Sequence, residues 1–236
     1  MKRVLSLFFV LLLVFPAVGW AEQKPSYITF YRHGNENENR IAITIDDWAK
    51  PEEWLPQFLD VAKENGALLT LYPVGKYILA KDRALWQRAI DEGHEIGNHS
   101  NTHPNLANAS RDRIIAQLTK MEKRLVDALG HDYTINTVRL PYGSGWEKGS
   151  RSAFARAIHD AGYVHVIRWN VDTKDLTVSQ IMRKVKNGSI VLLHAKKGDL
   201  KKMTALLPLL KEKGFEMVTV SQLLGLTKTG RTADAQ

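Results

Sequence analysis

Two histidines four residues apart are the clearest sign of chemistry in this chain. His99 and His103 have the spacing of two imidazoles on one side of a turn, and Pro104 disfavours a helix that continues through His103. A carboxylate from elsewhere must complete a metal site, and the pair Asp46-Asp47 is the donor that we expect. Two imidazoles and one carboxylate leave coordination positions for water and substrate, which is typical of a catalytic metal site. The alternative is that both histidines are ordinary surface residues.

The aspartate pair and a distant histidine could share proton transfer. Asp46 and Asp47 end a predicted strand and so point in opposite directions, which lets one bind a metal while the other accepts a proton from water. A turn or a helix cap is the other interpretation of the pair. His194 ends an apolar run, where it is either a neutral core histidine or a general acid. Asp175 or Asp172 could hold its tautomer and raise its pKa.

Two further side chains follow a predicted strand at the same edge. Arg139 is either a surface cation or the partner that keeps an aspartate ionised. Tyr142 could offer its backbone N–H to an oxyanion, unless Arg139 to Gly143 is a simple turn. Trp48 and Trp146 adjoin these segments, and each is either a core residue or a platform for a sugar ring.

Short apolar runs alternate with longer segments of helical periodicity, and this alternation predicts the elements that position these residues. The predicted strands are Ile41–Ile45, Ala67–Val74, Glu95–Asn98, Thr137–Leu140, Val164–Trp169, Ser189–Leu193 and Phe215–Val218. Predicted helices cover Glu53–Asn65, Ala84–Glu92, Arg111–Leu129, Ser150–Ala161, Val178–Lys186, Leu200–Lys213 and Ser221–Leu224. Seven alternations favour a single α/β domain, a distorted and incomplete (β/α)7-type barrel, with a doubly wound open sheet as the alternative. In both folds the reactive groups gather at the carboxyl ends of the strands.

The beginning of the chain has the layout of an export signal. Lys2 and Arg3 precede an apolar run, and small residues at positions 19 and 21 favour cleavage after Ala21. We therefore expect a signal peptide over residues 1–21, a catalytic domain over 22–227 and a flexible tail over 228–236. An uncleaved anchor is the alternative, although the run is shorter than a spanning helix and contains Pro16. This layout predicts a periplasmic or secreted protein without a stable membrane anchor.

The composition excludes several classes of function. The 236 residues include no cysteine, which rules out disulfides, thiolate metal sites and cysteine nucleophiles. The formal net charge of +8 suits an anionic partner such as a cell-wall polymer or a membrane surface. No run of basic residues interleaves with aromatic ones, so we expect no nucleic acid partner.

Five short segments resemble, in order, the five motifs of the polysaccharide deacetylases, carbohydrate esterase family 4. They are Thr44-Ile-Asp-Asp47, His99-Ser-Asn-Thr-His103, Arg139-Leu-Pro-Tyr-Gly143, Asp172-Thr-Lys-Asp175 and Leu193-His194. The resemblance covers about residues 30–226. It implies a distorted (β/α) barrel and one divalent metal ion held by Asp47, His99 and His103. Zn²⁺ is the expected ion, with Co²⁺, Ni²⁺ or Mn²⁺ as alternatives.

The resemblance also implies a role for each remaining residue. Asp46 would be the base that activates water for attack on the N-acetyl group of a GlcNAc unit. The Tyr142 N–H would stabilise the oxyanion, and His194 would protonate the leaving amine. Arg139 would orient Asp46, and Asp175 would orient His194. The expected substrate is an extracytoplasmic polymer, peptidoglycan or poly-GlcNAc first and chitin oligomers next.

The chain departs from the family pattern at a few positions, which keeps other functions open. The segment Trp48-Ala-Lys-Pro51 follows the aspartate pair where the family usually has Gly-Pro, and we expect Trp48 to alter the cleft wall. Leu176 replaces the usual tryptophan after Asp175, and Leu140 replaces the commoner proline. Two alternatives follow: a deacylase of a non-sugar amide or acetyl ester, and a catalytically silent carbohydrate-binding protein.

Overall fold

The computed structural model describes residues 26–227, so the expected signal peptide and tail lie outside the described residues. Its strands are β1 (Thr29–Tyr31), β2 (Arg40–Asp46), β3 (Leu69–Tyr72), β4 (Glu95–Ile96), β5 (Thr137–Val138), β6 (His165–Ile167), β7 (Val171–Asp172), β8 (Ile190–His194) and β9 (Glu216–Val218). Its α-helices are α1 (Pro51–Asn65), α2 (Arg83–Asp91), α3 (Arg111–Leu129), α4 (Ala153–Asp160), α5 (Val178–Lys184), α6 (Lys197–Glu212) and α7 (Val220–Leu224). Short 3-10 turns cover Gly75–Tyr77, Ala80–Asp82, Pro141–Gly143 and Trp146–Lys148. Within the described range, no helix is long and apolar enough to span a bilayer.

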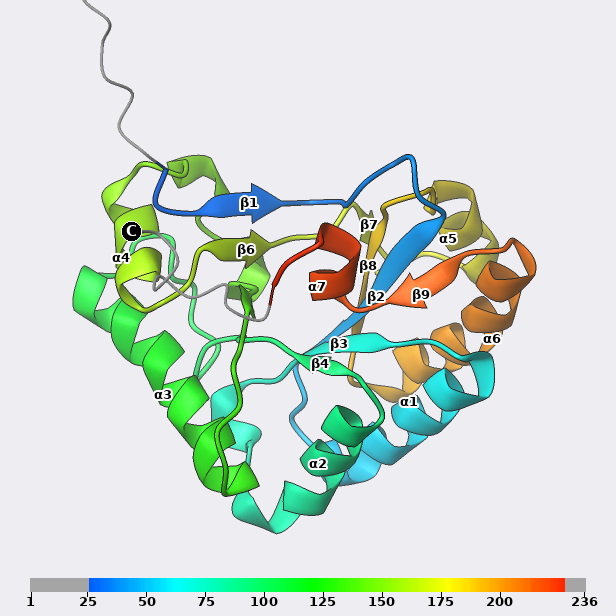
Figure 1. Ribbon diagram of the computed structural model, residues 1–236, viewed down its shortest axis with the longest axis horizontal. Coiled ribbons are helices and arrows are strands. Elements are labelled where there is room, and N and C mark those ends of the chain that lie inside the picture. The colour runs from blue at the N-terminus through cyan, green and yellow to red at the C-terminus, as the bar shows by residue number, and fades with distance from the viewer. Residues whose placement is uncertain (1–25, 228–236) are drawn as a thin grey trace, which may run out of the picture.

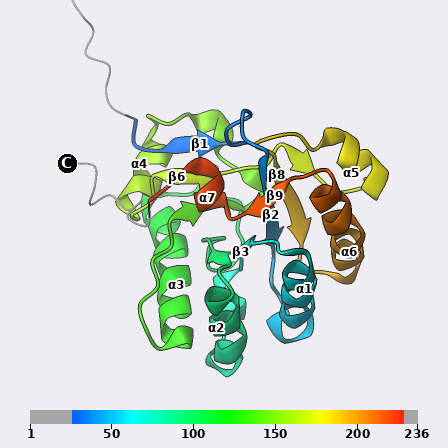
Figure 2. The ribbon, with the colours of Figure 1, turned by 45° about the vertical axis from the view of Figure 1, so that its right-hand side comes forward.

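The strands form two parallel sheets that together make an open, distorted barrel. The larger sheet has the order β4-β3-β2-β8-β7, with β9 also pairing with β2, and the smaller has the order β1-β6-β5. An isolated parallel bridge between Asn98 and Val138 joins the two sheets. Strands β2 to β6 thus follow one another around the barrel, as the (β/α)7-type expectation requires and a doubly wound sheet does not. Helices α1, α2 and α3 stand side by side around the strands (Figures 1 and 2).

Alternation along β2 explains how one strand serves both the core and the site. Ile41, Ile43 and Ile45 are fully buried in the large apolar cluster that includes the helices. Ala42 belongs to a smaller cluster that draws on both sheets and on α7, so this side of β2 faces the barrel interior. The next residues on that side are Thr44 and Asp46, and Asp46 is the last residue of the strand.

The predicted helices are all present, with ends shifted by a few residues, and their termini follow local sequence signals. Ser110 caps α3 by accepting a hydrogen bond from the Arg113 N–H. Gly66 and Gly130 end α1 and α3 in the left-handed conformation. Two short strands were not expected. Thr29–Tyr31 lies in a segment expected to be irregular, and Val171–Asp172 in one expected to be a loop.

Candidate active site and metal centre

Two of the expected metal ligands sit in strained backbone at the carboxyl edge of the larger sheet. Asp47 directly follows β2 and has a φ of 65°, and His103, in the loop after β4, has a φ of 62°. Such left-handed values are unusual for residues other than glycine and gather at functional sites. The Ser100 hydroxyl accepts a hydrogen bond from the His103 N–H at 3.1 Å and helps to hold that turn. The strain aims both side chains at the same point.

Three ligand atoms converge there. Asp47 Oδ1 lies 3.4 Å from His99 Nε2 and 3.1 Å from His103 Nε2, and the three atoms lie within 4.8 Å of one another. His99 Nδ1 donates to the Arg139 carbonyl at 2.6 Å, which leaves a lone pair on Nε2. Asp47 Oδ1 is itself buried without a hydrogen-bond partner. Electron-rich atoms that face one another in this way fit a divalent cation between them.

The electrostatics of Asp47 agree with a ligand role. Burial opposes ionisation of its carboxyl, yet the imidazoles of His103 and His99 outweigh burial and hold its pKa far below the usual range. Asp47 is therefore a carboxylate at neutral pH, the form that binds a cation.

Asp46 is held by a buried arginine, as expected for a base that must stay ionised. Arg139 Nη1 donates to Asp46 Oδ1 at 2.8 Å and to Thr44 Oγ1 at 2.6 Å. Arg139 is fully buried, with its guanidinium 4.3 Å from the centre of the Tyr72 ring. The second oxygen, Asp46 Oδ2, lies 3.7 Å from His99 Nε2 and so points toward the metal centre. The pair leaves one carboxylate oxygen for a proton from water.

His194 has a carboxylate partner, but it is Asp199 and not the expected Asp175. Asp199 Oδ2 lies 3.5 Å from His194 Nδ1 and accepts the His194 backbone N–H at 2.9 Å. This carboxylate raises the pKa of His194 against the opposing effect of burial, which favours the protonated acid. Asp175 and Asp172 are exposed, and among residues 26–227 neither forms an ion pair with His194. In the structure, Asp199 and not Asp175 therefore contacts His194.

Asp199 was missed because it lies in the first turn of α6, where an aspartate is common for reasons of helix polarity alone. The only sequence signal is its position five residues after His194. Its exposed fraction is only 4%, which distinguishes it from a solvated carboxylate at a helix end.

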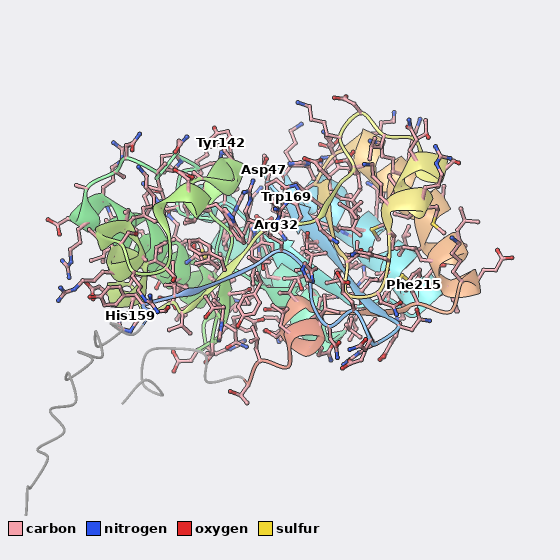
Figure 3. The ribbon with its side chains drawn as sticks, turned by 90° about the horizontal axis from the view of Figure 1, so that it is seen from above. Arg32, Asp47, Tyr142, His159, Trp169 and Phe215 are labelled. Atoms are coloured by element: carbon pink, nitrogen blue, oxygen red, sulfur yellow. The ribbon has the colours of Figure 1, made fainter. Side chains whose placement is uncertain are left out.

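Tyr142 and the two tryptophans divide between surface and core. Tyr142 has a φ of 61°, is 67% exposed and packs its ring 4.7 Å from that of His103. In the view of Figure 3, Tyr142, Asp47, Trp169 and Arg32 are labelled close to one another. Trp48 is fully buried and donates to the Ile45 carbonyl at 2.9 Å, so the expectation that it shapes the cleft wall is wrong. Trp146 is half-buried and remains beside the site.

Comparisons with known proteins find similar sequences and similar folds. The family model described as polysaccharide deacetylase matches residues 33–166. A peptidoglycan-N-acetylglucosamine deacetylase of Listeria monocytogenes is 30% identical over 80% of this chain, which spans only 40% of that relative's length. The structure of the Bc1960 peptidoglycan N-acetylglucosamine deacetylase has a TM-score of 0.72 and 28% identity, over 84% of this chain and 94% of that one.

A pseudoenzyme of the same fold is also similar. The Bacillus anthracis protein BA3943, described as a CE4 family pseudoenzyme, has a TM-score of 0.70 and 26% identity, over 83% of this chain and 68% of that one. Fold alone therefore does not decide activity, and the side chains of the site must. The match to the family model covers more than half of the sequence, and the chain belongs to the polysaccharide deacetylase family.

Proposed function

We propose that this protein is a metal-dependent hydrolase that removes N-acetyl groups from GlcNAc units of an extracytoplasmic polysaccharide. The observation that carries the proposal is the convergence of Asp47 Oδ1, His99 Nε2 and His103 Nε2 beside the Arg139–Asp46 pair. Named relatives that act on peptidoglycan support a GlcNAc polymer as substrate. The catalytic domain is taken as residues 22–227, exported to the periplasm or the exterior after removal of residues 1–21.

A divalent cation, Zn²⁺ or else Co²⁺, Ni²⁺ or Mn²⁺, would be held by Asp47, His99 and His103 and supply Lewis acidity and a more acidic water. Asp46 accepts the proton of the attacking water through the oxygen that Arg139 leaves free. The Tyr142 backbone N–H stabilises the negative charge on the carbonyl oxygen.

His194 then supplies the proton that completes the reaction. The water oxygen bonds to the acetyl carbon, the C–N bond breaks, and the amine leaves with a proton from His194, giving acetate and a free amino sugar. Asp199 stabilises the imidazolium before transfer, because its carboxylate contacts the ring.

The alternatives are weakened by the same structure. The non-sugar deacylase rests on Trp48 and on the altered residues Leu176 and Leu140, and Trp48 is a core residue and not part of a cleft wall. A silent binder, as in the pseudoenzyme, does not need the buried Arg139–Asp46 pair and the Asp199–His194 contact that are both present here.

The test is acetate release by the purified protein from peptidoglycan, poly-GlcNAc and chitin oligomers. We expect release to stop with a chelator, to return with Zn²⁺, and to fall by roughly 10²–10⁴-fold in Asp46→Asn. Asp60→Asn, an exposed aspartate on α1, is the matched control and should keep full activity. Full activity in Asp46→Asn would overturn the mechanism, and zinc binding without release from any polymer would favour the silent binder.

A further inference from the structure

Two arginines lie side by side at the carboxyl edge of the smaller sheet. Strands β1 and β6 are parallel and pair Tyr31 with Ile167, so Arg32 and Arg168 are the next residues of each strand in the same register. Side chains at paired positions of parallel strands point to the same side of the sheet. Both guanidiniums meet the Trp146 ring, at 6.0 Å from Arg32 Cζ and 5.3 Å from Arg168 Cζ.

These two cations have aromatic neighbours instead of carboxylate partners. Arg168 also lies 5.5 Å from the Trp169 ring, and its Nε is buried without a hydrogen-bond partner. Within residues 26–227, neither arginine forms an ion pair. Burial lowers the pKa of Arg168 and the charge of Arg32 lowers it further, while only the exposed Glu147 acts in the other direction. The two positive charges therefore repel each other until an anion joins them.

The pair adjoins the proposed reaction centre. A Cβ placed on Gly143 would lie 2.9 Å from Arg168 Nε, so the guanidinium touches the turn that carries Tyr142. Arg139, which holds Asp46, donates from Nη2 to the Arg168 carbonyl at 3.1 Å.

We propose that Arg32, Arg168 and the Trp146 indole form a subsite for a carboxylate carried by a sugar next to the GlcNAc unit that is deacetylated. Planar guanidiniums match the two oxygens of a carboxylate, and the Trp146 indole holds the two guanidiniums beside each other. The inference rests on the proposed function and sharpens it, because it selects an anionic polymer such as peptidoglycan over neutral chitin. The carboxylate is that of a free lactyl ether or that of a stem peptide.

The experiment measures binding to metal-free protein, so it does not depend on turnover. Tryptophan fluorescence follows titration with three glycan strands of equal length: peptide-free strands with lactyl carboxylates, peptide-bearing strands, and peptide-free strands with esterified carboxylates. Wild-type protein should prefer one carboxylate-bearing strand over the esterified strand by about tenfold or more, and less so at high salt. Whichever carboxylate-bearing strand is preferred identifies the source of the carboxylate.

The variants assign that preference to the two arginines. Arg32→Gln and Arg168→Gln should each bring the ratio of affinities close to one, and Arg32 is exposed, so its variant is free of folding effects. The matched control is Arg156→Gln, which removes an exposed arginine on helix α4. Arg156 also lies beside an aromatic ring, 5.9 Å from that of Tyr27, and its variant should keep the wild-type ratio of affinities. A ratio near one in wild-type protein, or one retained in the Arg32→Gln, Arg168→Gln double variant, would overturn the subsite. Acetate release from a neutral GlcNAc oligomer tests the proposed function separately.

Discussion

At the scale of single residues, hydrogen bonds from neighbouring groups fix the tautomer or the orientation of the side chains in the site. His99 has one tautomer because its Nδ1 donates to the Arg139 carbonyl, and Asp46 has one orientation because Arg139 binds one of its oxygens. Arg139 thus acts on both, through its carbonyl and through its guanidinium. This preorganisation means that little reorganisation is left for the chemical step.

Asp199→Asn tests whether Asp199, which contacts His194 in the structure, sets the pKa of that histidine, in place of the expected Asp175. The Asp199 carboxylate raises the pKa of His194, so replacing it with an amide lowers that pKa. The His194 imidazolium then loses its proton at a lower pH. We expect kcat to fall by roughly 10-fold or more at neutral pH and the alkaline limb of the pH–rate profile to shift to lower pH. Wild-type activity should itself decline only above pH 6.5, as pH rises through the raised pKa.

Asp175→Asn is the control for that experiment. Asp175 is exposed in the loop after β7, so its variant should keep the wild-type profile. A shifted profile in Asp175→Asn together with an unchanged one in Asp199→Asn would restore the role that the sequence alone suggested.

At the scale of elements, close packing between β3 and the end of β4 fixes the position of the Tyr72 ring, against which the Arg139 guanidinium packs. Gly97 follows β4, and a Cβ there would lie 2.2 Å from Tyr72 Cε1 and 3.0 Å from Thr137 Oγ1. Tyr72 is fully buried and cannot move away without disturbing the Arg139 guanidinium stacked on it.

We therefore expect Gly97→Ala to lower the free energy of unfolding by about 1–3 kcal/mol, measured by urea denaturation. Gly198→Ala is the matched substitution, since a Cβ at Gly198 meets nothing within 4 Å and the residue lies in α6. It should leave stability unchanged or raise it by up to about 1 kcal/mol. Equal free energies of unfolding for the two variants would contradict this prediction and show that the Tyr72 ring can move away from an added Cβ at little cost.

A buried histidine makes the other end of β3 sensitive to acid. His94 Nδ1 accepts the Leu69 N–H at 2.9 Å, which requires a neutral ring, and burial lowers the His94 pKa to about 4. The unfolded chain takes up this proton near pH 6.5, so stability is complete above that pH and is lost as pH falls toward 4.

Between pH 7.5 and pH 5 this histidine should cost about 2 kcal/mol of stability. Urea denaturation at both values measures the difference, and His94→Asn should reduce it by about that amount. His131→Gln, a variant of an exposed histidine, should show the wild-type difference. The same pH dependence in His94→Asn and in wild type would exclude His94 as its source.

At the scale of the whole molecule, a bound metal should tie folding to the site. A cation that binds the folded protein at about 1,000 times its dissociation constant adds roughly 4 kcal/mol of stability. We expect Zn²⁺ to raise the melting temperature above that in chelator and Asp47→Asn to abolish most of the rise. Glu38→Gln, which alters an exposed carboxylate away from the site, should keep it. Equal melting temperatures with zinc and chelator would argue against the centre.

The sequence predicts the helices, and it picks out the three side chains that converge in the structure, Asp47, His99 and His103, because periodicity and motif spacing are local properties. It does not predict β1 or β7, since strands of three and two residues in polar segments are stabilised by pairing with distant neighbours. Asp199 and the Arg32–Arg168 pair are missed for a similar reason. Their meaning depends on which element packs beside which, and only the register of β1 and β6 brings the two arginines together.

The isolated bridge between Asn98 and Val138 joins two sheets whose residues have different proposed roles. Asp46, Asp47, His99 and His194 belong to the larger sheet and the segments that follow its strands, and Arg139 and Tyr142 follow β5 of the smaller sheet. Arg32 and Arg168 instead extend β1 and β6. Substitutions that accumulate at the ends of β1 and β6 therefore leave the bond-breaking groups in place. On the proposed function and subsite, evolution can therefore change the polymer that binds while the groups that carry the reaction stay the same.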